Sequence, residues 1–356
     1  MAHTPEAVLI IGGGQSGFAG ARAVRDAGLH PVLLEAGDRT VGSWPAYYDS
    51  LTLFSPARYS AFPGTPFPGD PDRYPTRDEV VAYLERYAAS LDAEIHTGTA
   101  ATRVEPAGKG FVVHTATGET FFGAAVIAAT GSFSNPYVPA IPGLDAFSGQ
   151  TLHVADYRGP KQYAGQRVIV VGAGNSAIQV GYELAEVADT TLAMRTPVQF
   201  VPQTRGGRDL HYWLHTLRLD LLPPAALSRI IRGTPVLDNG IYRAALESGQ
   251  LKQQPMFQSL KGDDVIWADS KRERVDAVIF ATGYRPNLPY LRSLGALDGA
   301  GTPLHKRGVS LTHPGLAYLG VEFQRSFSSN TLRGVNRDAD YVVRALSAHI
   351  RRSTDA

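Results

Sequence analysis

The amino-acid sequence predicts an α/β fold made of two Rossmann-like dinucleotide-binding domains, with the second domain inserted into the first. The main observation is a motif that occurs twice, at residues 8–17 and 168–177: an apolar run, a glycine-rich turn and small residues that open a helical pattern. A second repeat, at residues 125–131 and 277–283, reads as a buried strand. Because such a strand–turn–helix unit binds a diphosphate at its helix N-terminus, two copies predict two bound dinucleotides.

The glycines of each turn have separate physical roles. In the first copy Gly12 makes the tight turn, Gly14 lets the backbone approach a pyrophosphate, and Gly17 lets the helix pack closely on the strand. The second copy has Gly172 and Gly174 in the first two places. The residues that open the two helices, and that we expect beside the phosphates, are Gln15, Ser16, Asn175 and Ser176.

The end of the next strand distinguishes the two motifs. After the first motif this strand ends at Glu35, whose carboxylate can accept a hydrogen bond from a free ribose 2′-hydroxyl. At the same distance after the second motif stand Arg195 and Thr196, which suit a 2′-phosphate. Taken singly, either position could be a solvated strand end, but the matching offset favours binding. We therefore predict FAD at the first site and NADPH at the second.

Both copies of the repeated strand end in Thr-Gly, at Thr130 and Gly131 in the first copy and at Thr282 and Gly283 in the second. Each copy is expected to close one nucleotide-binding half, with the glycine letting the backbone pass close to a cofactor. The alternative is two unrelated strands, which the agreement in both sequence and spacing disfavours. We therefore include Thr130 and Gly131 in the FAD site.

Composition and charge exclude several classes of function. The chain has 356 residues, of which 44% are hydrophobic and 19% charged, and this is typical of a soluble protein with two cores. A net charge of +1 favours neither nucleic acid nor an anionic membrane, and a cytoplasmic location is expected. The absence of cysteine excludes disulfides, thiol nucleophiles and CxxC redox pairs. No histidine has metal-ligand spacing with carboxylates, so no metal site is predicted.

The middle of the first domain is predicted to contain a long ordered loop. Residues 54–75 are rich in proline and in aromatic residues, whereas a disordered linker would be poor in aromatics. We therefore expect a functional loop packed by its own rings. The spacing of apolar residues over 77–91 predicts an amphipathic helix, and residues 94–115 predict antiparallel strands.

These elements suggest the domain boundaries. The FAD-binding domain is predicted over residues 1–160, the NADPH-binding domain over 161–277, and residues 278–356 return to the first domain. A helix is predicted to open at Ser328, where free N–H groups would suit the pyrimidine edge of a reduced flavin. An ordinary serine-capped surface helix fits the sequence equally well. The residues placed at the flavin by this prediction are Asn330, Thr331 and Leu332.

Three further segments resemble one enzyme family. Residues 147–157 resemble the FxGxxxHxxx(Y/F) fingerprint of flavin-dependent monooxygenases, residues 280–284 resemble their FATGY segment, and residues 41–44 resemble the stretch beside the flavin. The resemblance covers nearly the whole chain and is closest to compact bacterial members of the class B, flavin-containing monooxygenase type, some of which are encoded beside arsenic or metal resistance genes. The fingerprint positions are Phe147, Gly149, His153 and Tyr157, and the FAD site gains Gly42, Ser43, Trp44 and Val104.

The resemblance implies an FAD- and NADPH-dependent monooxygenase. NADPH would reduce FAD, oxygen would add to give a peroxyflavin, and one oxygen atom would pass to a thioether sulfur or an amine nitrogen. Baeyer–Villiger enzymes usually carry Trp-Pro where this chain has Tyr157 and Arg158, which favours the sulfur- and nitrogen-oxidising branch. The implied partners are a small-molecule substrate and molecular oxygen, and a homodimer is left open. His153 is expected to hold the linker by hydrogen bonds rather than to act as a base.

One position departs from the pattern of the family. Members that oxidise sulfur and nitrogen usually have an asparagine in a segment like L-x-T-N-x-P, where this chain has Phe54. A phenyl ring can pack against the flavin and exclude water, but it cannot donate a hydrogen bond. Two other functions therefore stay open: an NADPH oxidase or reductase that inserts no oxygen, and a redox-sensing flavoprotein of low turnover.

Overall fold

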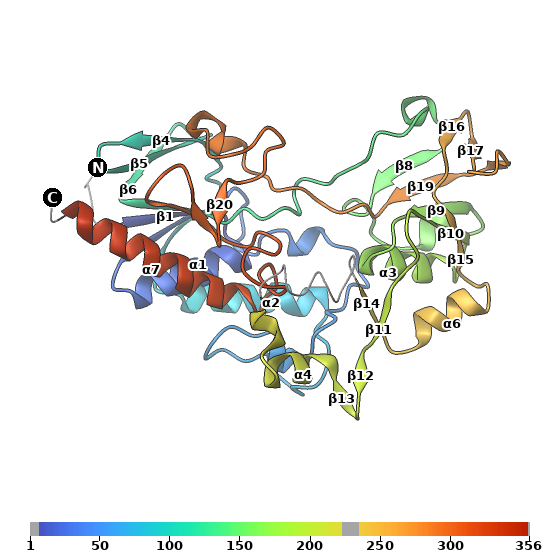
Figure 1. The fold of residues 1–356 in the computed structure, drawn as a ribbon, viewed down its shortest axis with the longest axis horizontal. Helices are drawn as coiled ribbons and strands as arrows, with labels where there is room; N and C mark the ends of the chain where they lie inside the picture. Colours follow the sequence, from blue (N-terminus) through green and yellow to red (C-terminus); the bar gives the residue numbers. More distant parts are fainter. Residues whose placement is uncertain (1–6, 223–234, 355–356) are drawn as a thin grey trace.

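The computed structural model describes residues 7–222 and 235–354 of the chain. Figure 1 shows two lobes, each with a β-sheet and packed helices, and two extended chain segments that run between them. Both chain ends lie at the same lobe, so the chain leaves this first lobe and later returns to it. This arrangement is the predicted α/β fold with one unit inserted into the other.

The first lobe is built on a seven-stranded sheet in the order β20-β21-β22-β7-β1-β2-β3. Strands β22, β7, β1, β2 and β3 pair in parallel, and β21 and β20 extend the sheet in antiparallel fashion. The repeated strand β7 lies directly beside β1, so both strands deliver their carboxyl ends to the same edge. The strands are β1 (Ala7–Ile11), β2 (His30–Leu34), β3 (Glu94–His96), β7 (Ala125–Ala128), β20 (His305–Lys306), β21 (Val309–Ser310) and β22 (Leu316–Tyr318).

Alternation along β1 divides its side chains between two cores. Val8 and Ile10 belong to a core with helices α1, α2 and α7, while Leu9 and Ile11 belong to a core on the other face, which a three-stranded antiparallel sheet covers. The helices are α1 (Gln15–Asp26), α2 (Arg77–Ser90) and α7 (Val335–Thr354), and the covering strands are β4 (Ala101–Ala107), β5 (Gly110–Thr115) and β6 (Thr120–Gly123).

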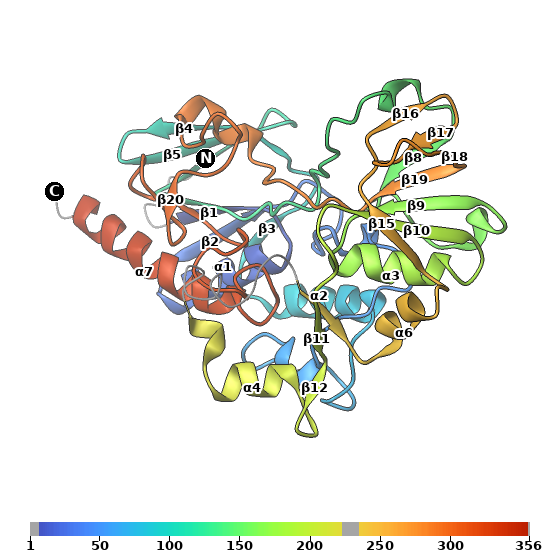
Figure 2. The same cartoon turned by 45° about the vertical axis from the view of Figure 1, so that its right-hand side comes forward.

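The second lobe repeats this design with a parallel sheet in the order β15-β10-β9-β19-β8. Val168 and Val170 pack with α3 and α6, and Ile169 and Val171 pack with a second three-stranded sheet, on the side seen in Figure 2. The elements are β8 (Gln150–His153), β9 (Arg167–Val171), α3 (Asn175–Leu184), β10 (Asp189–Met194), α6 (Ile241–Glu247), β15 (Lys252–Pro255), β16 (Ser259–Lys261), β17 (Asp264–Ile266), β18 (Arg272–Arg274) and β19 (Ala277–Phe280).

The proline-rich loop is ordered, but its rings do not pack only on one another. Phe62 and Phe67 are buried against Tyr83 and Tyr87 of α2, with 4.0 Å between the Phe67 and Tyr83 ring centroids. The Tyr83 hydroxyl donates to the Thr65 carbonyl oxygen at 2.6 Å and accepts from the Phe62 amide at 2.7 Å. The predicted helix over 77–91 is therefore what holds the loop in place.

Three sequence-based boundaries differ from the structure. Strand β8 falls in the range predicted for the FAD-binding domain, yet it pairs with β19 and forms an edge strand of the second sheet. Strand β19 also extends beyond residue 277, the predicted end of the NADPH-binding domain. Strand β3 joins the first parallel sheet, and antiparallel pairing starts only with β4. The last helix begins at Val335, because the Ser328 carbonyl oxygen accepts from the Thr331 amide and hydroxyl and forms a turn instead.

Candidate functional site

One large cavity lies between the two lobes. It has a volume of about 1400 Å³, and both predicted nucleotide-binding turns line its wall. The two cofactor sites expected from the sequence therefore open into one space. The predicted residues that line it are Gly12, Gly14, Gln15, Ser16, Glu35, Gly42, Ser43, Trp44, Phe54, Thr130, Gly131, Gly172, Gly174, Asn175, Ser176, Arg195, Thr196, Asn330, Thr331 and Leu332.

The first turn is shaped for close approach of a phosphate. Gly12 has φ +112°, and a Cβ atom there would lie 2.7 Å from the Ala129 carbonyl oxygen. A Cβ at Gly17 would lie 1.9 Å from the Gly12 carbonyl oxygen, so this position needs glycine for packing. Helix α1 begins at Gln15 with no side-chain cap at Gly14. Its first-turn N–H groups lack intrahelical partners, so they fit the diphosphate of a dinucleotide.

Glu35 stands at the end of β2, beside this turn. Its two carboxylate oxygens accept from the backbone amides of Gly13, at 2.5 Å, and Gly37, at 2.7 Å. These bonds fix the carboxylate on the cavity wall, and its remaining lone pairs can accept from ribose hydroxyls. The position therefore fits the ribose of the dinucleotide whose phosphates lie at α1.

Gln15 ties together three segments that the sequence assigns to the flavin. Its Nε2 donates to the Asn330 carbonyl oxygen at 2.7 Å, and its Oε1 accepts from the Trp44 indole N–H at 3.2 Å. Thr130 is held separately, since its hydroxyl donates to the Asn287 carbonyl oxygen at 2.7 Å. The turn, the stretch around Trp44 and the segment before α7 thus surround one side of the cavity.

Two residues predicted at the FAD do not line the cavity. Val104 is fully buried in the core between the first sheet and β4–β6, where it packs with Phe111 and Val113. Its side chain belongs to this core, so the assignment of Val104 to the flavin stays a prediction that the cavity lining does not support. Gly17 is also off the wall, and it acts through helix–strand packing, as its place in the motif predicts.

The second turn repeats the geometry of the first. Gly172 has φ +146°, and a Cβ there would lie 2.5 Å from the Ala281 carbonyl oxygen, so β19 passes as close to this turn as β7 does to the first. Helix α3 begins at Asn175 without a side-chain cap. Arg195 and Thr196 follow β10 directly, are solvent-exposed and line the cavity. They are therefore accessible to a 2′-phosphate.

The fingerprint residues lie at the junction of the lobes, away from the cavity wall. His153 Nε2 donates to the Gly283 carbonyl oxygen at 3.1 Å, and its Nδ1 accepts from the Ala155 amide at 3.1 Å. Burial lowers the pKa of His153 and so favours the neutral imidazole, which makes these two hydrogen bonds. A row of aromatic contacts runs from Trp44 through Tyr47, Phe133 and Tyr284 to His153.

The other fingerprint residues are structural in their contacts. Tyr157 is fully buried between Tyr48 and Tyr163. A Cβ at Gly149 would lie 2.6 Å from the Phe147 ring and 2.7 Å from the Asp276 carbonyl oxygen. These contacts hold the linker against the second sheet. We therefore expect the fingerprint residues to fix the position of the linker between the two domains.

A polar cluster beside Phe54 was missed by sequence reasoning. Asp209, the N-cap of α4 (Leu210–Thr216), accepts at one oxygen from His211, through Nδ1 at 2.8 Å and the amide at 2.7 Å. Its other oxygen accepts from the Tyr74 hydroxyl at 2.5 Å and from Gln203 Nε2 at 2.6 Å. Burial alone would raise the pKa of Asp209, but these bonds lower it to about 2, so Asp209 is ionised.

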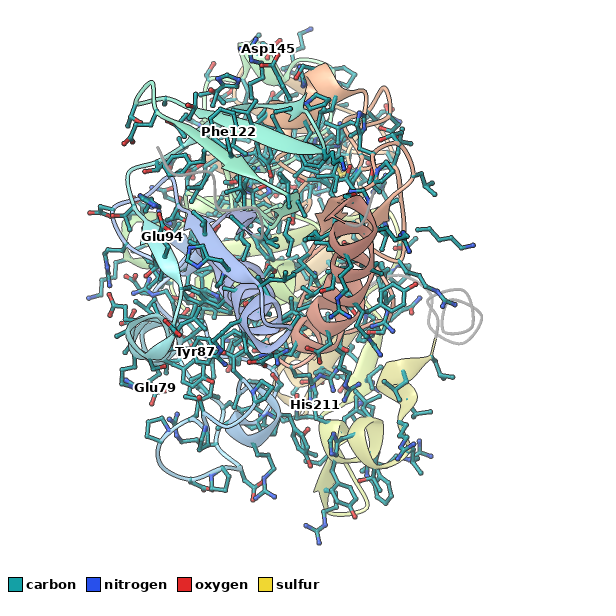
Figure 3. The ribbon with its side chains drawn as sticks, turned by 90° about the vertical axis from the view of Figure 1, so that its left-hand side faces the viewer. Glu79, Tyr87, Glu94, Phe122, Asp145 and His211 are labelled. Atoms are coloured by element: carbon teal, nitrogen blue, oxygen red, sulfur yellow. The ribbon has the colours of Figure 1, made fainter. Side chains whose placement is uncertain are left out.

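The cluster forms between segments that are far apart in the sequence, so no local pattern predicts it. The Phe54 ring is 39% exposed, lines the cavity and stacks on His211 with 6.1 Å between centroids. Gln203 also donates to the Phe54 carbonyl oxygen at 3.2 Å. In Figure 3, His211 lies on the side of α4 (yellow) that faces the loop segment drawn in blue. The one local signal is the Asp-Leu-His sequence at the start of a short helix.

Within residues 7–222 and 235–354, no group of three histidine, aspartate or glutamate side chains is placed to bind a metal ion. No helix in these two described ranges has the length and apolar character needed to cross a membrane.

The chain is similar in sequence to known oxidoreductases and monooxygenases. Residues 9–222 match the pyridine nucleotide-disulphide oxidoreductase family. An oxidoreductase described as CzcO-like, from Geobacillus kaustophilus, is 31% identical over 347 residues, which cover 96% of this chain and 98% of that protein. An indole-3-pyruvate monooxygenase of Oryza sativa subsp. japonica is 31% identical over 81% of this chain and 79% of its own length.

A solved structure is similar over nearly the whole chain. A flavin-containing monooxygenase from Stenotrophomonas maltophilia superposes with a TM-score of 0.84 at 32% identity, covering 97% of this chain and 99% of its own. Cyclohexanone monooxygenase, at 18% identity and a TM-score of 0.72, shares the fold. The fold of the whole chain is therefore that of a known flavin-containing monooxygenase.

Proposed function

We propose that this chain, which belongs to the pyridine nucleotide-disulphide oxidoreductase family and is a class B flavin-dependent monooxygenase, oxygenates a soft nucleophile, the sulfur of a thioether or the nitrogen of an amine. Its cofactors are FAD and NADPH. Since the chain contains no cysteine, thiol–disulfide exchange on its own side chains is excluded.

The observation that carries this proposal is the shared cavity. The turn of α1 fits FAD, the turn of α3 with Arg195 fits NADPH, and Phe54, Leu210 and Leu214 line the same space. When bound, FAD accepts a hydride from NADPH and activates molecular oxygen. The protein aligns the two dinucleotides and surrounds the reacting region with apolar side chains that exclude water. An apolar wall of this kind suits a small uncharged thioether or a neutral amine.

The direct test is oxygenation by the FAD-loaded protein with NADPH and a panel of thioethers, amines, ketones and a 2-oxo acid. The 2-oxo acid is included because the relative from rice is named for indole-3-pyruvate. Oxygenated product, NADPH and hydrogen peroxide are measured together. We expect sulfoxide or N-oxide from the first two classes. Product from ketones or the 2-oxo acid alone, or protein that cannot be loaded with FAD, would refute the proposal.

A second candidate, NADPH oxidase activity, is favoured by Phe54. The ring lines the cavity at the position where the sequence pattern that this chain resembles has an asparagine. Unlike an amide, a phenyl ring offers no hydrogen bond to oxygen. We therefore expect leaky turnover, in which much of the NADPH consumed yields hydrogen peroxide. Sulfoxidation of small thioethers is expected to be slow but measurable.

Phe54→Asn tests the cause of this leak. A neutral hydrogen bond is worth about 1 kcal/mol, so the ratio of product to peroxide should rise by about fivefold. Phe54→Leu is the matched control, because it removes the same ring contact with His211 and adds no amide. Peroxide near background in the natural protein would contradict the leaky enzyme. An equal gain in both variants would show that loss of the ring, rather than the amide, changes coupling.

A further inference from the structure

We propose that His211, held by Asp209, delivers the proton that the reaction consumes, with Asp209 as its positioning residue. The inference rests on the proposed function for its chemistry, but it concerns residues to which neither the motifs nor the comparisons give a role. The two side chains form a carboxylate–imidazole pair at the end of the cavity beside Phe54.

The geometry leaves one nitrogen of His211 for this task. Nδ1 donates to Asp209 at 2.8 Å, so that nitrogen carries a hydrogen and Nε2 is the atom that gains and loses the second proton. No hydrogen bond of Nε2 is found among the described residues, although the side chain is 2% exposed and lines the cavity. An ionised carboxylate behind an imidazole fixes its tautomer and stabilises its cation, as in hydrolase triads.

Two aromatic rings pack against the imidazole. Phe54 stacks on it at 6.1 Å with an interplanar angle of 28°, and Tyr59 stacks at 6.3 Å with 26°. Asp209 is in turn bound by Tyr74 and Gln203, so it cannot rotate away from His211 without losing two further bonds. Such an arrangement costs ordering free energy, and an imidazole placed only to fill space would not need it.

The stoichiometry of the reaction consumes one proton. NADPH supplies a hydride, oxygen is reduced, one oxygen atom forms a new bond to the substrate and the other leaves as water. For a substrate X the balance is NADPH + H⁺ + O₂ + X → NADP⁺ + XO + H₂O. The uncoupled reaction, NADPH + H⁺ + O₂ → NADP⁺ + H₂O₂, also consumes one proton. Because water is excluded from the site, a side chain that can donate and then be recharged from solvent accelerates either outcome.

Several charged or titratable side chains lie around His211. Asp209 is ionised above a pKa of about 2, and burial raises the pKa values of Tyr59 and Tyr74, which stay neutral at physiological pH. His215, exposed on the same helix with its ring 5.7 Å from that of Tyr59, is the other histidine of the cluster. Arg333 lines the cavity with a permanent charge. Glu322 also lines the cavity, and burial raises the pKa of its carboxyl. Replacing the two histidines separately distinguishes the role of His211 from those of its neighbours.

The test compares His211→Gln, Asp209→Asn and the control His215→Gln, all loaded with FAD and checked for equal flavin content. Reoxidation of the NADPH-reduced protein by oxygen is followed from pH 5.5 to 9, in water and in deuterium oxide. General acid catalysis is typically worth at least about 100-fold, so His211→Gln should slow reoxidation on this scale and remove its pH dependence. Asp209→Asn should keep a pH-dependent limb, moved to lower pH, since an amide stabilises the cation less. His215→Gln should behave like the natural protein.

A second measurement does not depend on turnover. Nitrogen-15 NMR of histidine-labelled, FAD-loaded protein, with His211→Gln to assign the signal, should show the neutral ring of His211 protonated at Nδ1. Asp209→Asn should raise the share of the other tautomer. A ring protonated at Nε2 in the natural protein, or a His211→Gln variant with the natural pH profile and solvent isotope effect, would overturn the proposal. Neither readout needs an oxygenated substrate, because the first follows flavin reoxidation by oxygen and the second follows the imidazole nitrogens. Failure to oxygenate any substrate therefore refutes the proposed function and leaves this test intact.

Discussion

Gly14→Val is expected to give a folded but colourless protein. Gly14 has φ −93° and ψ −168°, an extended conformation that valine adopts easily, so the backbone should survive the change. A Cβ there would lie 3.3 Å from the Gly42 Cα. We expect the two methyl groups beyond it to hinder the approach of a pyrophosphate to the turn. Overpacking costs up to about 3 kcal/mol, which corresponds to about a hundredfold weaker binding of FAD.

The measurement is flavin content by absorbance after purification and after reconstitution with excess FAD. Gly299→Ala is the matched control, because no atom lies within 4 Å of the added Cβ and its φ is not positive. Far-ultraviolet circular dichroism checks that both variants fold. A Gly14→Val protein that stays yellow would show that the diphosphate does not lie against this turn.

Local sequence features predicted the parts of the fold that depend on short-range chemistry. The two glycine motifs located both sheets, because the backbone of each turn passes so close to the neighbouring strand that a side chain would clash, as at Gly12 and Gly172. The sequence did not place the Val104 side chain in a core, because alternation along a strand does not distinguish a buried side chain that faces a cofactor from one that faces a core. The last helix was started early because Ser328 and Thr331 form a turn that resembles a helix start.

The polar cluster at the end of the cavity had no local signature. His211 reaches Phe54 and Tyr59 only because the second lobe extends α4 against the proline-rich loop of the first. Tyr74 and Asp209, which are 135 residues apart, share a hydrogen bond for the same reason. Sequence periodicity describes one element at a time, so contacts between two loops of different domains lie beyond it.

Arg195→Ala should separate the two nicotinamide coenzymes. Arg195 and Thr196 follow β10 at the cavity wall, and the guanidinium is positioned to bind a 2′-phosphate that NADH does not have. Hydrogen bonds to charged groups are worth about 1.5–3 kcal/mol. NADPH should therefore lose about 10- to 150-fold in kcat/KM, mainly through KM, while NADH should change little. Steady-state oxidation of both coenzymes measures the effect.

Neighbouring side chains are poorly placed to compensate for the lost guanidinium. Gln203 is engaged with Asp209 and with the Phe54 carbonyl oxygen, and the Arg208 guanidinium lies 5.1 Å from the ring centroid of Tyr212. Arg205 is solvent-exposed, and none of these three side chains lines the cavity. The full loss is thus expected. Arg272→Ala removes an equally cationic side chain that pairs with Asp264 on the same lobe, and it should leave both coenzymes unaffected. Equal losses for NADPH and NADH in Arg195→Ala would mean that Arg195 supports the end of β10 and does not bind the 2′-phosphate.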